Sequence, residues 1–236
     1  MKKVLDKILL SDNVLKEYYK AIENTQFKDW LCSVLPEIQK CKYLKQDNPW
    51  HIYNCLDHIL HSVEEMNKQT KDLKPSTRRI MAYTMFLHDV GKPECYIRRY
   101  SKAYEREVDS FFDHNLAGEK IAHRVLPQFG FNKKESELIE FLVKQHDMFI
   151  NITLTDEGNR YKKVLTNELL DNLINEFSTV GTAGNGDNVL KLLVMVARAD
   201  NLAQNPKMTK DALKLLDIVN EKINEDLGNS SCTKIL

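Results

Sequence analysis

The chain's seven histidines all fall in its middle part and could bind a metal ion. They are His51, His58, His61, His88, His114, His123 and His146. Histidine is the commonest transition-metal ligand in proteins, whereas a single inward histidine is more often an ordinary core residue. Helical spacing places one histidine of each helix on the apolar side, with His61 and His123 facing away. Several inward histidines together favour a metal site.

His88 and Asp89 end a very apolar stretch, residues 80–87. An unpaired carboxylate buried there would cost several kcal/mol or become neutral, and a bound cation would remove that penalty. The alternative is an ion pair with a basic side chain such as Lys92. Asp200 repeats the pattern at the end of a second apolar stretch, where it could share a metal with His88 and Asp89 or bond to a neighbouring helix.

The elements that must position these residues are predicted to be helices, because apolar residues recur with a period of 3.6 and no run alternates as a strand does. Residues 2–47 predict two or three short helices. Asn48 and Pro49 predict the start of another, as cap and first residue. Its expected apolar stripe is Ile52, Cys55, Leu56, Ile59, Leu60, Val63 and Met66.

Further helices are predicted along the rest of the chain, with a polar, basic and aromatic loop or short hairpin at residues 93–110. The helices are expected at 76–89, 113–127, 133–146, 161–177, 187–204 and 209–224. Gly181, Gly184 and Gly186 predict a turn before the helix at 187. The fold class is therefore an all-α single domain.

Composition supports long helices and excludes several classes. The 236 residues include only 8 Gly and 6 Pro, and 34 basic residues balance 34 acidic ones. A neutral chain lacks the basic excess of most nucleic-acid-binding proteins. No apolar run is long enough to span a membrane. Five scattered cysteines without a Cys-x-x-Cys pair, and no export signal, predict a cytoplasmic protein with reduced thiols.

The string Leu-His-Asp-Val-Gly-Lys-Pro at residues 87–93, with His58 before it and Asp200 after it, resembles the HD-domain metal-dependent phosphohydrolase superfamily. Further segments are similar to the HD portion of tRNA nucleotidyltransferases and their stand-alone relatives. They are residues 51–60, 112–118 and 199–204. The resemblance implies an HD helical bundle at 48–205, an N-terminal helical extension at 1–47, and a C-terminal helix and tail at 206–236.

The resemblance also implies a ligand set. Four core metal ligands map onto His58, His88, Asp89 and Asp200; in two-metal relatives two further histidines join, here His114 and His146, with Asp89 bridging the ions. The chain lacks the nucleotidyltransferase head and the Gly-Tyr-Pro signature of cyclic-di-nucleotide phosphodiesterases, which argues against those two activities.

The expected chemistry is hydrolysis of a phosphate ester by metal-activated water. Imidazole and carboxylate ligands suit one or two ions of Fe, Mn, Co, Ni, Zn or Mg. Such an ion lowers the pKa of bound water to about 7. Asp89 would hold the metals and accept a proton. Lys92 is assigned catalytic and phosphate-binding roles, and His51, Arg99 and Lys102 are assigned to substrate binding, each with a structural alternative.

The expected partner is a small phosphorylated substrate, foremost a nucleotide. RNA is not favoured, no membrane contact is expected, and the oligomeric state stays open. Two alternatives remain. The chain could be a non-catalytic nucleotide- or RNA-binding HD module, which would show salt-dependent RNA affinity without turnover. The metal could also be purely structural, which open coordination positions would argue against.

Overall fold

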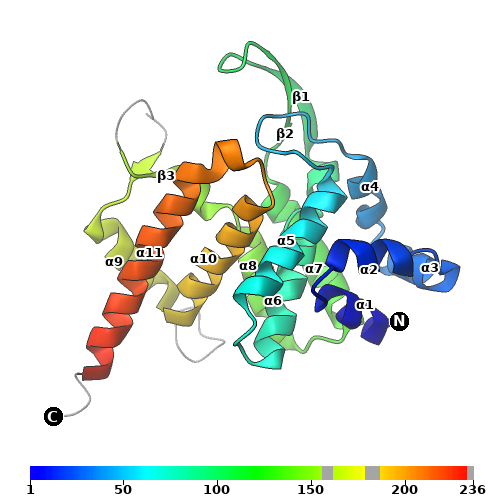
Figure 1. Ribbon diagram of the computed structural model, residues 1–236, viewed down its shortest axis with the longest axis horizontal. Coiled ribbons are helices and arrows are strands. Elements are labelled where there is room, and N and C mark those ends of the chain that lie inside the picture. Colours follow the sequence, from blue (N-terminus) through cyan, green and yellow to red (C-terminus); the bar gives the residue numbers. More distant parts are fainter. Residues whose placement is uncertain (156–161, 179–186, 233–236) are drawn as a thin grey trace.

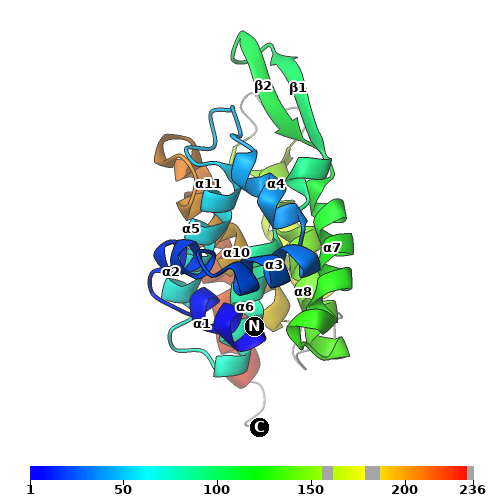
Figure 2. The same cartoon turned by 90° about the vertical axis from the view of Figure 1, so that its right-hand side faces the viewer.

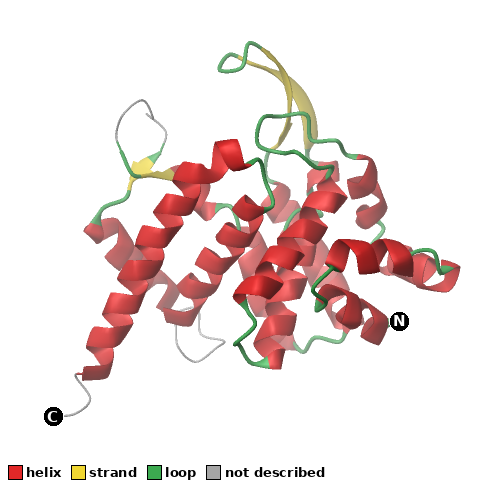
Figure 3. Cartoon of the chain, in the orientation of Figure 1, coloured by secondary structure: helices red, strands yellow, loops and turns green. Residues whose placement is uncertain are grey.

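The computed structural model describes residues 1–155, 162–178 and 187–232. Within these ranges eleven α-helices dominate, and the all-α prediction is confirmed (Figure 3). The helices are α1 Lys2–Leu9, α2 Val14–Ala21, α3 Thr25–Val34, α4 Glu37–Tyr43, α5 Cys55–Gln69, α6 Pro75–Leu87, α7 His114–Phe129, α8 Lys133–Gln145, α9 Asn167–Ser178, α10 Asp187–Leu202 and α11 Pro206–Cys232.

Helices α5 and α6 form the centre of the bundle. They pack against each other and against α10, while α7 packs on α8 and α11 on α10. The N-terminal helices cover one side, with α1 against α6, and α2 and α4 against α5 (Figure 1). The core is continuous across these helices, and α5 contributes an unbroken apolar face from Cys55 to Met66. No helix in the described part of the chain is long and apolar enough to cross a membrane.

A β-hairpin projects from one end of the bundle (Figure 2). Strands β1 Tyr96–Ser101 and β2 Arg106–Phe111 pair antiparallel, as one of the two expectations for residues 93–110 proposed. Arg98 fixes its base, because its guanidinium donates to Asp109 Oδ1 at 2.7 Å and to Asp47 Oδ2 at 2.8 Å. Asp109 Oδ2 also accepts from the backbone N–H of Asp47. The hairpin is thereby tied to the end of the N-terminal segment.

Minor elements complete the described chain. The 3₁₀ turn η1 Lys92–Glu94 follows α6, and η2 Met148–Asn151 follows α8. Two-residue strands β3 Ile152–Thr153 and β4 Lys163–Val164 pair in parallel. That pairing shortens the helix predicted at 161–177, since α9 begins only at Asn167. The predicted turn at Gly181, Gly184 and Gly186 lies outside the described residues.

The predicted start of the helix at Asn48 and Pro49 was wrong. Asn48 instead accepts from the backbone N–H of Trp50, which is a local turn that competes with helix formation. Helix α5 begins at Cys55, and its cap is Asn54, whose side chain accepts from the Asp57 N–H at 2.9 Å. Ile52 consequently lies outside the apolar stripe and is 54% exposed. The rest of the stripe is buried as predicted.

Candidate metal centre

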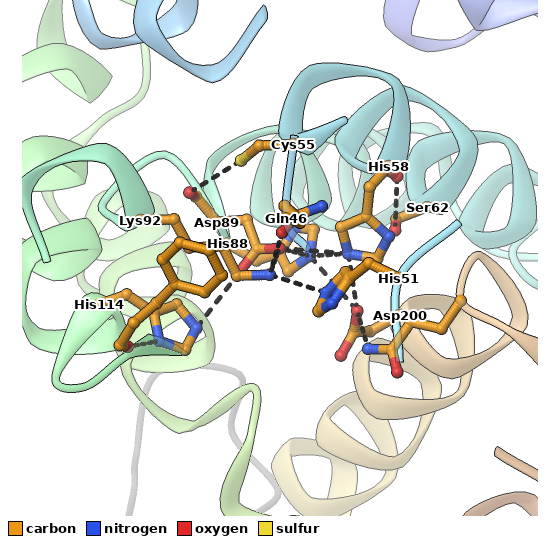
Figure 4. A network of polar contacts seen from close by, with 12 residues as sticks. Gln46, His51, Cys55, His58, Ser62, His88, Asp89, Lys92, His114 and Asp200 are labelled. Atoms are coloured by element: carbon orange, nitrogen blue, oxygen red, sulfur yellow. Dashed lines mark hydrogen bonds and ion pairs between the residues drawn. The ribbon is translucent and has the colours of Figure 1, made fainter. Parts of the chain in front are cut away.

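Five helices bring six ionisable side chains to one point inside the bundle. Figure 4 shows all of them except His146. Most of these side chains are at helix ends, which is where a bundle can direct them inward from several directions. His58 is on the second turn of α5 and Asp200 on the last turn of α10. The others are His88 and Asp89 after α6, His114 at the start of α7, and His146 after α8. All except His114 are buried.

One carboxylate oxygen of Asp89 faces the first pair of histidines. Asp89 Oδ2 is 3.1 Å from His58 Nε2 and 3.4 Å from His88 Nε2. Asp200 Oδ1 closes this group, at 2.9 Å from His58 Nε2 and 3.6 Å from His88 Nε2. The two ring nitrogens are themselves 3.3 Å apart. His58, His88 and Asp200 could hold one divalent cation, and Asp89 Oδ2 lies beside them.

The other oxygen of Asp89 faces a second pair of histidines. Asp89 Oδ1 is 3.3 Å from His114 Nε2 and 3.7 Å from His146 Nε2, and these two nitrogens are 3.1 Å apart. This group could hold another cation. Asp89 is therefore shared between two groups of potential ligands.

The four rings are oriented by backbone carbonyls on the side away from the carboxylates. A carbonyl oxygen only accepts, so each Nδ1 carries the hydrogen and each Nε2 faces the centre. The Nδ1 atoms donate to Ala203 O (His58, 3.2 Å), Met85 O (His88, 2.7 Å), Phe111 O (His114, 2.7 Å) and Val143 O (His146, 2.7 Å). This is how metal-binding imidazoles are usually held. Converging lone pairs and carboxylates need cations or protons between them, so the residues fit a divalent metal.

The carboxylates are strongly acidic in this surrounding. Burial alone would raise the pKa of Asp89, but Lys92 and His88 outweigh it and hold that pKa well below its usual range. Burial would likewise raise the pKa of Asp200, but hydrogen bonds from His58 and His88 outweigh burial and hold that pKa well below its usual range. Both groups are thus ionised and available as ligands at neutral pH.

His58 takes up the proton that balances this charge. Burial would lower its pKa, but hydrogen bonds to Asp200 and Asp89 outweigh burial and raise the pKa of His58 to about 9. The metal-free cluster is therefore stabilised by an imidazolium at the position where a cation would bind.

Lys92 forms the ion pair that was considered as the alternative for Asp89. Its Nζ is 2.5 Å from Asp89 Oδ2, and the residue is only 5% exposed. Burial would lower the pKa of Lys92, but Asp89 outweighs it and raises that pKa. The ion pair and the histidine cluster coexist, because Asp89 offers two oxygens and Lys92 approaches only one of them.

His51 is held by Lys92 and so differs from the other histidines. An ammonium can only donate, so His51 Nε2 accepts from Lys92 Nζ at 3.0 Å and His51 Nδ1 donates to Asn48 Oδ1 at 2.8 Å. Burial, followed by the charge of Lys92, keeps the pKa of His51 well below normal. His51 also lies close enough to His58 and Asp89 to form a third group of potential ligands, but its lone pair is already used.

Two polar residues follow Asp200 on the chain. Gln204 Nε2 donates to Asp200 Oδ1 at 3.0 Å. The Asn201 amide instead donates to the Ala197 carbonyl of its own helix at 2.8 Å. His61 and His123 face away from the cluster, as predicted; each contacts a nearby glutamate.

The two remaining candidates lie on the hairpin. Arg99 donates to Ser110 Oγ at 2.8 Å, and its guanidinium lies 5.2 Å from the centre of the exposed Phe112 ring. Lys102 follows β1 in the connecting turn. Within the described residues, no hydrogen bond or ion pair joins either side chain to the histidine cluster.

The sequence did not predict the contact between Gln46 and Lys92. Its Oε1 accepts from Lys92 Nζ at 2.9 Å. An isolated glutamine between Lys45 and Asp47 carries no motif, and it precedes the part of the chain that resembles the HD superfamily. Only the folded backbone brings it to Lys92.

Comparison with known proteins gives a partial likeness. The chain is 28% identical over 119 residues to a bifunctional uridylyltransferase/uridylyl-removing enzyme of Bradyrhizobium sp. (strain ORS 278). The match covers 44% of this chain and 11% of that enzyme, so the chain corresponds to a small part of its relative. No family model matches the chain. What the structure itself shows is that several His and Asp groups of the chain could bind a divalent metal ion.

Proposed function

We propose that the chain is a metal-dependent phosphohydrolase of the HD-domain superfamily that cleaves a phosphate ester of a nucleotide or similar small molecule. The observation that carries this proposal is the position of Asp89, whose two oxygens each face a pair of imidazole nitrogens. Residues 48–205 would form the HD domain, with residues 1–47 and 206–236 as helical extensions.

The proposed ligands follow from this arrangement. His58, His88, Asp89 and Asp200 would hold one cation, and Asp89, His114 and His146 would hold a second. When bound, such ions activate water and stabilise charge on phosphoryl oxygens. Thiolates are absent from all three potential ligand groups among the described residues, so Fe, Mn, Co, Ni, Zn and Mg are the candidate metals.

The chain's own side chains would do the remaining work. The backbone carbonyls on the Nδ1 atoms keep the rings in place, and burial of Asp89 protects the centre from bulk water. Lys92 would exchange its contact with Asp89 for a phosphoryl oxygen, as a point charge. Asp89 would also accept a proton. His51, Arg99 and Lys102 are the proposed substrate-binding residues around Lys92 and on the hairpin.

A nucleotide is the proposed substrate class for two reasons. The relative's name refers to removal of a uridylyl group, and the exposed Phe112 ring beside Arg99 offers a surface on which a base could stack. The balanced charge of the chain favours a small phosphate ester over a long polyanion.

Turnover on a substrate panel tests this function. Protein reconstituted with Mn²⁺ or Fe²⁺ would be assayed with nucleoside monophosphates, cyclic nucleotides and uridylylated peptide, next to Asp89→Asn. His123→Ala is the matched control, because His123 is exposed and lies outside the cluster. We expect hydrolysis by wild type and His123→Ala and loss of at least about 10²-fold in Asp89→Asn. Absence of turnover, together with salt-dependent RNA binding, would instead support the non-catalytic module.

A further inference from the structure

Gln46 combines two unusual features for a polar residue outside any helix or strand. Its side chain is almost wholly buried, with 1% of the residue exposed. Its backbone is left-handed, with φ of 57°, a conformation that glutamine rarely adopts and that persists only where the surroundings enforce it. Both features call for an explanation in what the side chain contacts.

Both ends of the Gln46 amide are used. Nε2 donates to the Tyr53 carbonyl at 3.3 Å, which fixes which end is the oxygen, and Oε1 accepts from Lys92 Nζ at 2.9 Å. The backbone carbonyl of Gln46 accepts from the Asn48 N–H at 2.7 Å, so the turn itself is also held. The left-handed turn thus serves to place one oxygen on Lys92 (Figure 4).

The Lys92 ammonium contacts three groups. It forms an ion pair with Asp89 Oδ2 at 2.5 Å, and it donates to Gln46 Oε1 at 2.9 Å and to His51 Nε2 at 3.0 Å. Only Asp89 faces the histidine pairs, so a cation on Asp89 would compete with the Lys92 ammonium for that oxygen. Gln46 and His51 would then still hold the ammonium next to the centre, and its charge would no longer be paired with Asp89.

We propose that Gln46 is a positioning residue that holds Lys92 ready to contact a substrate phosphate when a cation takes Asp89. This inference rests on the proposed phosphohydrolase function. It also makes the N-terminal segment, residues 1–47, a part of the site, since Gln46 lies within that segment and Asp47 next to it anchors the hairpin through Arg98.

A double-mutant cycle between Gln46 and Lys92 tests the role. Gln46→Gly removes the amide, while glycine adopts the left-handed turn without steric cost. Gln46→Gly, Lys92→Ala and the double variant would be compared for kcat/KM on the best substrate, for affinity of the Mn²⁺-loaded protein for inorganic phosphate, and for metal content. If Gln46→Gly does not fold, Gln46→Asn takes its place in the cycle, because its shorter side chain keeps an amide but moves it away from Lys92.

We expect Gln46→Gly to lower kcat/KM and phosphate affinity each by about tenfold, the effect of losing one hydrogen bond to a charged group. Metal content should be unchanged. In the Lys92→Ala background the same substitution should change both quantities less than about twofold, because Gln46 acts through Lys92. A purely structural role would give the same loss in both backgrounds and would overturn the inference.

The two proposals fail in different ways. A wild type that turns over no phosphate ester would remove the proposed function and the positioning role with it. An active wild type with an equally active, normally folded Gln46→Gly variant would remove the positioning role alone.

Discussion

Gly91→Ala should displace the start of α7 and with it His114. Gly91 has φ of −76°, so alanine is conformationally acceptable there and the effect is purely steric. A Cβ atom at this position would lie 2.2 Å from the His114 carbonyl oxygen and 2.7 Å from the Gly118 nitrogen. Both are backbone atoms of α7, and they cannot rotate away as a side chain can.

The size of the effect follows from these distances. Relieving a 2.2 Å contact requires a shift of about 1 Å, and a close-packed interior resists this. Overpacking of this kind costs about 1–3 kcal/mol, which for a chain of this length lowers Tm by roughly 2–12 °C. Because His114 moves with the helix, the 3.3 Å distance between its Nε2 and Asp89 Oδ1 should change as well.

Thermal unfolding followed by circular dichroism, with Mn²⁺ titration calorimetry on the same samples, measures both effects. Gly118→Ala is the matched control on the other side of the contact. The new Cβ would meet a Val143 methyl group at 3.1 Å, which is a side-chain atom that can shift. Alanine also has a higher helix propensity than glycine by up to about 1 kcal/mol. The two effects oppose each other, so we expect little change in Tm. Wild-type Tm and Mn²⁺ affinity in Gly91→Ala would refute the close packing of α7 on residues 88–91.

Two further results are expected. Since the pKa of His58 is about 9, Mn²⁺ binding near pH 7.5 should release close to one proton, and the Mn²⁺ affinity should rise up to about tenfold per pH unit until about pH 9. Calorimetry in buffers of different ionisation enthalpy measures the number of protons released. Zero release would contradict the prediction. Arg98→Ala should speed amide exchange of residues 96–111, because it removes the ion pairs to Asp47 and Asp109. The change in overall stability should be small, since the guanidinium is exposed to solvent. Unchanged exchange would show that Arg98 does not anchor the hairpin.

Much of the fold and the inward-facing histidines could be predicted from periodicity. The stripe from Cys55 to Met66 is buried because 3.6-residue spacing alone determines which side of a helix is apolar. The same spacing indicated that His58 faces inward and His123 outward. His88 and Asp89 were recognisable because a charged residue after an apolar helix must find a partner.

Other contacts depend on how the chain folds in three dimensions, which the spacing of apolar residues does not determine. The start of α5 was misplaced because Asn48 and Asn54 are both good caps, and only packing decides between them. Gln46 was missed because its contact with Lys92 joins residues 46 positions apart through a left-handed turn.

Metal content per chain decides whether the histidine cluster is a metal site. Wild type, His88→Ala, Asp89→Asn and the exposed control His123→Ala would be purified without chelator or nickel resin, reconstituted with Mn²⁺ or Fe²⁺, and analysed for metal. We expect about one or two ions in wild type and His123→Ala and a loss in the two cluster variants. Metal-free wild type after reconstitution, or undiminished metal in Asp89→Asn, would contradict it.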